Sequence, residues 1–215
     1  LMASGYKTVL QNLPEPLRSK MLHGDFSAGM EDNPWQVIPT AWVDAAMARW
    51  TEQQPDLPLS ALGVDIARGG KDQTTIAKRY GPWFARIQKY PGIQTPDGPS
   101  VSALVVLAHE GTAPIQIDII GVGGSGYDYV KGVKPNCTVP MNGAAKSSAR
   151  DRSGQLHFPN KRAEWHWKLR EALDPVTGDD LALPPDREMR ADLIAPRWKL
   201  SAQGIQIEEK DEIKA

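Results

Sequence analysis

The sequence contains almost no cysteine and no long apolar run, and each absence excludes a class of protein. Cys137 is the only cysteine among 215 residues, which excludes a disulfide framework and a multi-cysteine zinc site and suits a reducing compartment. No segment approaches the roughly 20 consecutive apolar residues of a membrane span. The net charge is −1, so the balance of charges favours no class of partner and any basic surface must be local.

The sequence has no P-loop motif, only part of a dinucleotide-binding motif, and no zinc-binding motif. No Gly-x-x-x-x-Gly-Lys-Ser/Thr motif occurs, although 143–147 is superficially similar to one, which excludes a P-loop ATPase. The segment 121–126 matches the glycine pattern of a dinucleotide-binding turn, but the acidic residue expected roughly 20 positions later is absent. His157 and His166 have no partner at metal-ligand spacing, so we do not expect zinc.

Two aspartates inside apolar segments are the most informative residues that are present. Asp65 lies within Leu-Gly-Val-Asp-Ile-Ala at 62–67, and Asp118 lies within Ile-Gln-Ile-Asp-Ile-Ile at 115–120. Both segments are short and rich in β-branched residues, which predicts core strands. A carboxylate inside a core strand costs several kcal/mol unless it is paired or binds a metal. Both segments lead into glycine-rich turns, which leave room for a ligand at the strand ends.

The order of the expected elements predicts the fold class. The first three strands can form an antiparallel meander, and the strand after the first helix can return parallel beside the first strand. This order predicts an α/β fold in which a mixed central sheet is flanked by helices, with Asp65 and Asp118 side by side at its edge. The expected strands are 59–67, 74–80, 83–90, 115–120 and 137–140, and the expected helices begin at Ser100 and span 125–132.

The two aspartates have the chemistry of a metal site. Adjacent carboxylates repel each other unless a cation lies between them. Oxygen ligands select Mg²⁺ or Mn²⁺, and two such ions about 4 Å apart can stabilise the attacking and leaving oxygens of a phosphodiester. We therefore expect Asp65 and Asp118 to be catalytic metal ligands, the alternative being hydrogen-bonded structural residues. Asp72 is a further candidate ligand or a turn residue, and Asp128 is better explained as a partner of a helix start.

The rest of the chain has less obvious chemistry. Residues 1–58 are rich in proline and contain one amphipathic helix capped by Thr40, which indicates a lead-in segment to a domain at 59–215. The chain begins at Leu1 and ends within a helix-like segment, so we expect a piece of a larger protein. Later elements are expected at 161–173, 186–194, 197–200 and 204–208.

Basic residues become frequent after the acidic segments. They are candidates for contacts to a DNA backbone, although a solvated helix face explains the later ones almost as well. They are Lys146, Arg150, Arg152, Lys161, Arg162, Lys168 and Arg170.

These segments together resemble the ribonuclease H-like nuclease domain of phage terminase large subunits, the motors that package viral DNA. The resemblance is carried by 62–72, by 117–128 and by Phe-Pro-Asn-Lys-Arg-Ala-Glu at 158–164. The segment 35–43 is similar to the one that joins the ATPase half of this family to its nuclease half. The resemblance therefore covers most of the chain, and it implies that residues 1–58 lead in from an ATPase half that is missing here.

The resemblance implies a Mg²⁺- or Mn²⁺-dependent endonuclease that cuts double-stranded concatemeric DNA in the host cytoplasm during packaging. Asp65 and Asp118 would be the first two metal-binding acids. The terminase small subunit and the portal would be partners of the full-length protein. The third acid of the family is expected after a strand like 204–207, and the chain ends at Ala215 without it. We do not expect Glu208, Glu209 or Asp211 to take its place.

Two other functions stay open. An actin- or sugar-kinase-like ATPase also has an acidic strand followed by a glycine turn, but it would need a second phosphate-binding hairpin and a longer chain. A non-catalytic module that docks DNA or partner proteins of a packaging complex is favoured by the missing third acid. ATP binding without nuclease activity would support the first, and metal-independent DNA binding would support the second.

Overall fold

The structure is a computed structural model that describes residues 33–67, 69 and 71–208. These residues fall into two compact units, which are described separately. The sheet unit comprises 49–145 and 181–184, and the described part of the helical unit comprises 33–48, 146–180 and 185–208. The expected boundary at residue 58 lies within the sheet unit, and the assignment of 1–58 as a lead-in from another domain stays a prediction.

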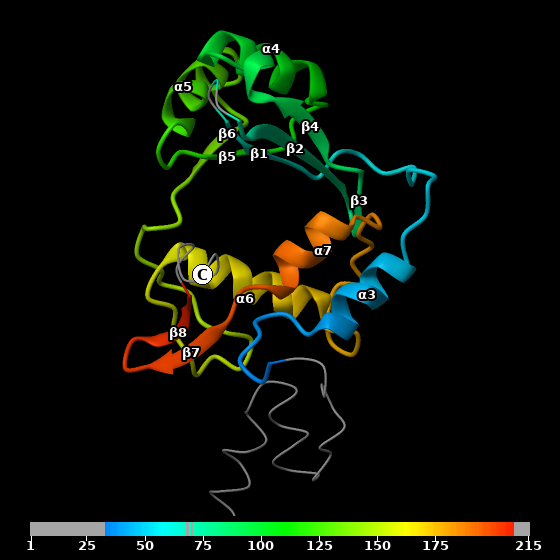
Figure 1. The fold of residues 1–215 in the computed structure, drawn as a ribbon, viewed down its shortest axis with the longest axis vertical. Coiled ribbons are helices and arrows are strands. Elements are labelled where there is room, and N and C mark those ends of the chain that lie inside the picture. Colours follow the sequence, from blue (N-terminus) through cyan, green and yellow to red (C-terminus); the bar gives the residue numbers. More distant parts are fainter. Residues whose placement is uncertain (1–32, 68, 70, 209–215) are drawn as a thin grey trace, which may run out of the picture. The chain divides into compact units, whose positions relative to one another are not determined.

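A six-stranded mixed sheet forms the centre of the sheet unit (Figure 1). Strand β1 (Ala61–Asp65) lies in the middle, antiparallel to β2 (Gln73–Tyr80) and parallel to β5 (Ile115–Asp118). Strand β6 (Thr138–Met141) pairs in parallel with β5 and forms one edge. The α/β class and the parallel return of the fourth expected strand beside the first are therefore confirmed.

The third expected strand, at 83–90, is interrupted. It consists of β3 (Trp83–Phe84) and β4 (Gln88–Pro91), and both pair antiparallel with the same strand, β2. Between them the backbone N–H of Ala85 donates to the carbonyl of Lys78 at 3.0 Å, so the chain stays along the edge of β2. The predicted meander is present with this break in its last strand.

Helices α4 (Gly98–Ala108) and α5 (Gly123–Val133) lie together on one face of the sheet (Figure 1). Successive side chains of a strand point to opposite faces. In β1 and β5 every second residue is buried against the helices, while the residues between them point to the other face. The buried residues that join the sheet to the two helices include Leu62, Val64, Ile115, Ile117, Val101, Val105 and Val130.

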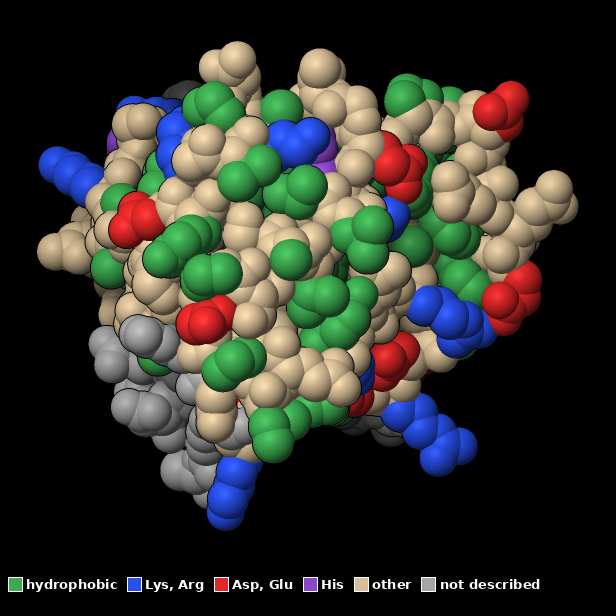
Figure 2. Space-filling view, turned by 90° about the horizontal axis from the view of Figure 1, so that it is seen from above, with side chains coloured by type: hydrophobic (Ala, Val, Ile, Leu, Met, Phe, Trp, Pro, Cys, Tyr) green, Lys and Arg blue, Asp and Glu red, His purple; other side chains and the backbone are tan. Residues whose placement is uncertain are grey.

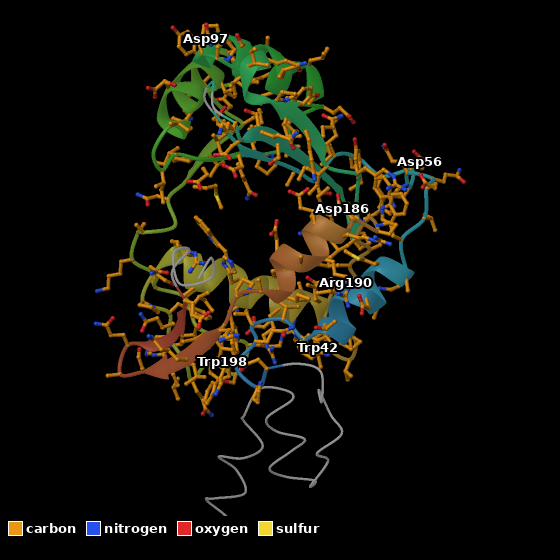
Figure 3. The ribbon with its side chains drawn as sticks, viewed as in Figure 1. Trp42, Asp56, Asp97, Asp186, Arg190 and Trp198 are labelled. Carbon is orange, nitrogen blue, oxygen red and sulfur yellow. The ribbon has the colours of Figure 1, made fainter. Side chains whose placement is uncertain are left out.

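Helix α4 begins earlier than predicted. Asp97, labelled in Figure 3, is its N-cap, and one carboxylate oxygen accepts hydrogen bonds from the backbone N–H and the hydroxyl of Ser100 at 2.9 and 2.6 Å. Pro99 fits the first turn because an N–H there would have no partner within the helix. Ser100 is thus inside the first turn and is not the cap.

The outer face over α4 and α5 carries no concentration of charge. Figure 2 shows hydrophobic side chains scattered among polar atoms on this face, and Leu107 is 84% exposed and Val133 58% exposed. Single exposed apolar side chains are ordinary on a protein surface. Among the described residues, no helix has the length and apolar character needed to cross a membrane.

The described part of the helical unit contains three helices and a hairpin, all close to their expected positions. The helices are α3 (Thr40–Ala48), α6 (Lys161–Leu173) and α7 (Arg187–Ile194), and the hairpin is β7 (Trp198–Ser201) with β8 (Gly204–Ile207). Helices α3 and α7 are joined by an ion pair between Asp44 and Arg190, whose two nitrogen–oxygen distances are 2.6 and 2.9 Å. Arg190 is labelled in Figure 3.

Three tryptophan side chains cluster in the helical unit. Trp198 makes edge contacts with Trp35 and Trp167 at ring-centroid distances of 5.3 and 5.2 Å. The hairpin docks closely because Gly204 has a φ of +97° and an added Cβ would lie 2.1 Å from the carbonyl oxygen of His157. This position requires glycine for both its conformation and its close approach.

Candidate functional site

Strands β1 and β5 end at Asp65 and Asp118. Their parallel register runs through three pairs, the last of which is Val64 with Ile117. One further step in the same register brings Asp65 beside Asp118, at the carboxyl ends of two adjacent strands. Parallel neighbours in register point to the same face, so both carboxylates lie on the face opposite α4 and α5. The predicted adjacency of these two residues is therefore present in the sheet.

The acids are not buried within core strands, in contrast to the sequence-based expectation. Asp65 is exposed and Asp118 is half-buried, because each is the last residue of its strand and points away from the helices. The apolar residues after the first acid, Ile66 and Ala67, are buried but lie outside the strand. The acids therefore avoid the cost of burial in the core and remain available to solvent.

Small side chains surround Asp65 on its face of the sheet. Asp65 lies opposite Thr75 in β2, and one pleat back Gly63 lies opposite Ala77. Because the side chains at these positions are short, an extended ligand can approach the carboxylates closely over the sheet.

Asp118 is held by the turn that follows it. The backbone N–H of Ile120 donates to its Oδ1 at 2.9 Å, and no described residue donates to its other oxygen. Helix α5 then begins directly against the end of β5, since a Cβ on Gly123 would lie 1.9 Å from the carbonyl oxygen of Asp118. The glycine-rich segment at 121–126 therefore permits close packing of helix on strand, a function that its resemblance to a dinucleotide-binding turn did not suggest.

The oxygen atoms of the two acids fit a hard divalent cation. Among the described residues, none makes a hydrogen bond or an ion pair with the carboxylate of Asp65. Within the same part of the chain, no group of three or more His, Cys, Asp or Glu side chains is arranged to hold a metal. Mg²⁺ is commonly held by one or two carboxylates and keeps several waters. The pair Asp65 and Asp118 suits that mode of binding.

The other acidic candidates are placed by other segments of the chain. Asp72 is exposed before β2, and its backbone carbonyl accepts from the N–H of Gly92 at 3.1 Å, which extends the pairing of β2 with β4. Asp128 is exposed in the second turn of α5, since the helix begins at Gly123 and not at the expected position. Glu208 follows β8 in the helical unit.

The expectations for Glu209 and Asp211 fall on positions outside the described residues, and nothing further follows for either.

Arg170 is not available to contact DNA. Its side chain belongs to a residue that is only 3% exposed, its guanidinium donates to the carbonyl of Val37, and it lies over the rings of Trp42 and Trp167 at 4.9 and 5.0 Å. Stacked planar contacts of this kind favour arginine over lysine. This basic residue has a structural role in the helical unit, contrary to its inclusion among the candidate DNA contacts.

Most of the remaining basic candidates have partners nearby in the helical unit. Lys161 and Lys168 pair with glutamates three residues along α6, each at 2.7 Å. Backbone carbonyls accept from Arg150, Arg152 and Arg162.

The pKa of Glu164 reflects two of these contacts. Burial raises the pKa of its carboxyl, but hydrogen bonds from Lys161 and from the hydroxyl of Ser147 outweigh burial, so the pKa lies below the ordinary value.

Lys146 differs from the other basic candidates, because it is exposed and no described residue pairs with it.

Comparison with solved structures identifies the fold. No protein family model and no curated protein matches the sequence. The structure is similar to the nuclease domain of the large terminase subunit gp2 of bacterial virus Sf6, with a TM-score of 0.60 and 19% identity over 83% of this chain and 90% of that chain.

Two mutant forms of the Sf6 domain give the same coverage and a TM-score of 0.60. One contains manganese and beta-thujaplicinol and is 18% identical, and the other contains calcium and is 19% identical. At this identity the similarity establishes the fold, which is the ribonuclease H-like mixed sheet of large terminase nuclease domains, as the sequence predicted.

Proposed function

We propose that this chain, which has the fold of large terminase nuclease domains, is a metal-dependent endonuclease that cuts double-stranded concatemeric viral DNA during genome packaging. The observation that carries the proposal is the position of Asp65 and Asp118, which end adjacent parallel strands and point to the same face. The manganese and calcium forms of the Sf6 domain support a divalent cation at a site of this fold.

The two acids would hold Mg²⁺ or Mn²⁺, and a two-ion site suits the reaction. A bound ion of this kind neutralises charge on the phosphate and makes water a stronger nucleophile. One carboxylate oxygen of Asp118 accepts from the N–H of Ile120, and the other is available to a metal. Among the described residues none bonds the carboxylate of Asp65, so both of its oxygens are available. The small residues Gly63 and Ala77 leave space for a sugar–phosphate backbone beside the acids.

The remaining parts of the site follow from the same proposal. Asp72, on the loop before β2, is the candidate outer ligand. Contacts to DNA would be mainly to phosphates, which position a duplex without reading its sequence. Lys146 is the candidate for such a contact, because it is exposed and no described residue pairs with it. In the full-length protein the partners would be the terminase small subunit and the portal, and the reaction would take place in the host cytoplasm.

A plasmid assay tests this function. Supercoiled plasmid is incubated with the chain in the presence of Mn²⁺, Mg²⁺ or EDTA, and relaxed and linear products are measured. We expect products with either metal and none with EDTA. If neither metal supports cleavage, a longer chain that continues past Ala215 is assayed, because the third acid of the family is expected there; failure of that chain as well would refute the proposal.

The same assay separates the alternatives. DNA binding that ignores metal and survives Asp65→Asn would support a non-catalytic docking module. Hydrolysis of ATP without cleavage of DNA would support an ATPase of the actin or sugar-kinase type.

A further inference from the structure

Two buried threonine hydroxyls hold the backbone just beyond Asp65. Ala67 follows the last pair of the β1–β2 ladder and is itself buried. Its N–H donates to the Oγ1 of Thr74 at 3.1 Å, and its carbonyl accepts from the Oγ1 of Thr95 at 3.0 Å. The two hydroxyl oxygens are 2.8 Å apart, and both threonines are fully buried. Both backbone polar groups of Ala67 are thus held by side chains.

These contacts can form a closed ring. In one arrangement the N–H of Ala67 donates to Thr74, the hydroxyl of Thr74 donates to Thr95, and the hydroxyl of Thr95 donates to the carbonyl of Ala67, so every proton is used once. The hydroxyl of Thr74 also lies 3.1 Å from the carbonyl of Ala67 and can donate to it directly. Thr74 belongs to β2, whereas Thr95 follows the short helix η1 (Gly92–Gln94). A buried peptide group left without a partner costs about 1–3 kcal/mol. The ring therefore fixes three separate segments at the carboxyl end of β1.

We propose that Thr74 and Thr95 are positioning residues for the carboxylate of Asp65, an inference that rests on the function proposed for the acid pair. The two acids differ in how they are held. Asp118 receives a hydrogen bond from Ile120, but among the described residues none holds the carboxylate of Asp65. The place of Asp65 is therefore set by its backbone, and the nearest residue beyond the strand whose backbone groups are held by side chains is Ala67.

A purely structural role is the alternative, because buried backbone groups require partners wherever they occur. The two roles differ in what the loss of a hydroxyl would change. A structural role predicts lower stability alone. A positioning role predicts that metal binding by the folded protein weakens as well, because the backbone that places the carboxylate of Asp65 would no longer be held.

The test compares four forms of the chain. Thr95→Val keeps the shape of the side chain and removes the hydroxyl, and Thr95→Ser restores the hydroxyl. Thr138→Val is the matched control, because Thr138 is 4% exposed and its hydroxyl donates to the carbonyl of Lys134 at 2.8 Å, at the other end of the sheet. Thermal unfolding is measured, together with the dissociation constant of Mn²⁺ from the signal of the free ion in electron paramagnetic resonance.

We expect Thr95→Val to weaken Mn²⁺ binding by up to about 10-fold, the low end for groups bonded directly to a metal ligand, because Thr95 acts through the backbone. Thr95→Ser should bind as the wild type does, and Thr138→Val should unfold at a lower temperature with unchanged affinity. Equal affinities for wild type and a folded Thr95→Val would overturn the inference. If Thr95→Val does not fold, Thr95→Ala takes its place.

Failure of the proposed function can be told apart from failure of this inference. If Mn²⁺ binds wild type and Asp65→Asn equally, the acid pair is not the metal site and the proposed function fails. The positioning role is then decided by nuclear magnetic resonance of the carboxyl carbon of Asp65 and by amide exchange at Ala67. Changes in both for Thr95→Val, with neither in Thr138→Val, support the role, and unchanged signals overturn it.

Discussion

Asp65 and Asp118 stand one residue beyond Val64 and Ile117, the last registered pair of two adjacent parallel strands. Because side chains alternate along a strand, the apolar partners point to α4 and α5 and the acids point to the opposite face. The shared register thus converts two similar sequence segments into one pair of carboxylates. Repulsion within such a pair is relieved by a cation, which connects the fold to the proposed chemistry.

Gly123→Ala is predicted to destabilise the sheet unit. The added Cβ would lie 1.9 Å from the carbonyl oxygen of Asp118, and neither backbone can move freely at the junction of β5 with α5. Overpacking typically costs about 1–3 kcal/mol, and we expect the upper end of that range in urea unfolding.

Gly132→Ala in the same helix is the matched control. No atom lies within 4 Å of its added Cβ, so this change is expected to stabilise the chain by up to about 1 kcal/mol through helix propensity. Similar effects of the two substitutions would contradict the close packing of α5 on the end of β5.

Stability at acid pH is predicted to depend on Glu164. Its pKa is lowered in the folded state, so its stabilising contribution is present above the unfolded pKa of about 4.3 and is lost as pH falls through the lower folded pKa. Glu164→Gln should lower the free energy of unfolding at neutral pH, and the difference from wild type should shrink below about pH 4.

Urea unfolding measured from pH 7 to pH 3 checks this dependence. Glu52→Gln is the control, because the side chain of Glu52 is 78% exposed in its pair with Arg86 and such pairs contribute only about 0–1 kcal/mol. A difference between wild type and Glu164→Gln that stays constant over this range would refute the assignment.

Arg170→Lys is predicted to lower stability although it conserves charge. Lysine cannot lie flat against Trp42 and Trp167 while donating to the carbonyl of Val37, and a desolvated cation–π contact contributes about 2 kcal/mol or more. A loss of at least this size is expected in urea unfolding. Lys146→Ala, at an exposed position, should leave stability unchanged; a larger loss there than in Arg170→Lys would contradict the burial of the arginine.

The strands and the acid pair could be predicted because their signals are local or periodic. β-branched residues in short segments indicated β1 and β5, and the order of elements indicated that they run in parallel. The predicted burial of Asp65 and Asp118 was wrong. Each is the last residue of its strand, and the alternation of side chains points it to the face away from the helices. Register alone decides this, and it is a property of two segments together.

Features that depend on distant segments could not be predicted from the sequence. Ser100 and Asp97 are both good N-cap residues, and only the geometry of the first turn selects Asp97. Arg170 lies on a helix rich in charge, and its burial depends in part on Trp42, which is far away in the sequence. Thr74 and Thr95 are 21 residues apart and carry no local sign of their contact.

The most direct test of the account measures plasmid cleavage with Mn²⁺ by wild type, Asp65→Asn, Asp118→Asn and Asp128→Asn. The last variant is the matched control, since Asp128 ends the segment 117–128 that contains Asp118 but is exposed on α5. The account predicts that each of the first two variants loses roughly 100-fold or more, beyond what partners one step from a metal usually contribute, and that the control retains activity. Cleavage by Asp65→Asn or Asp118→Asn at the rate of wild type would contradict it.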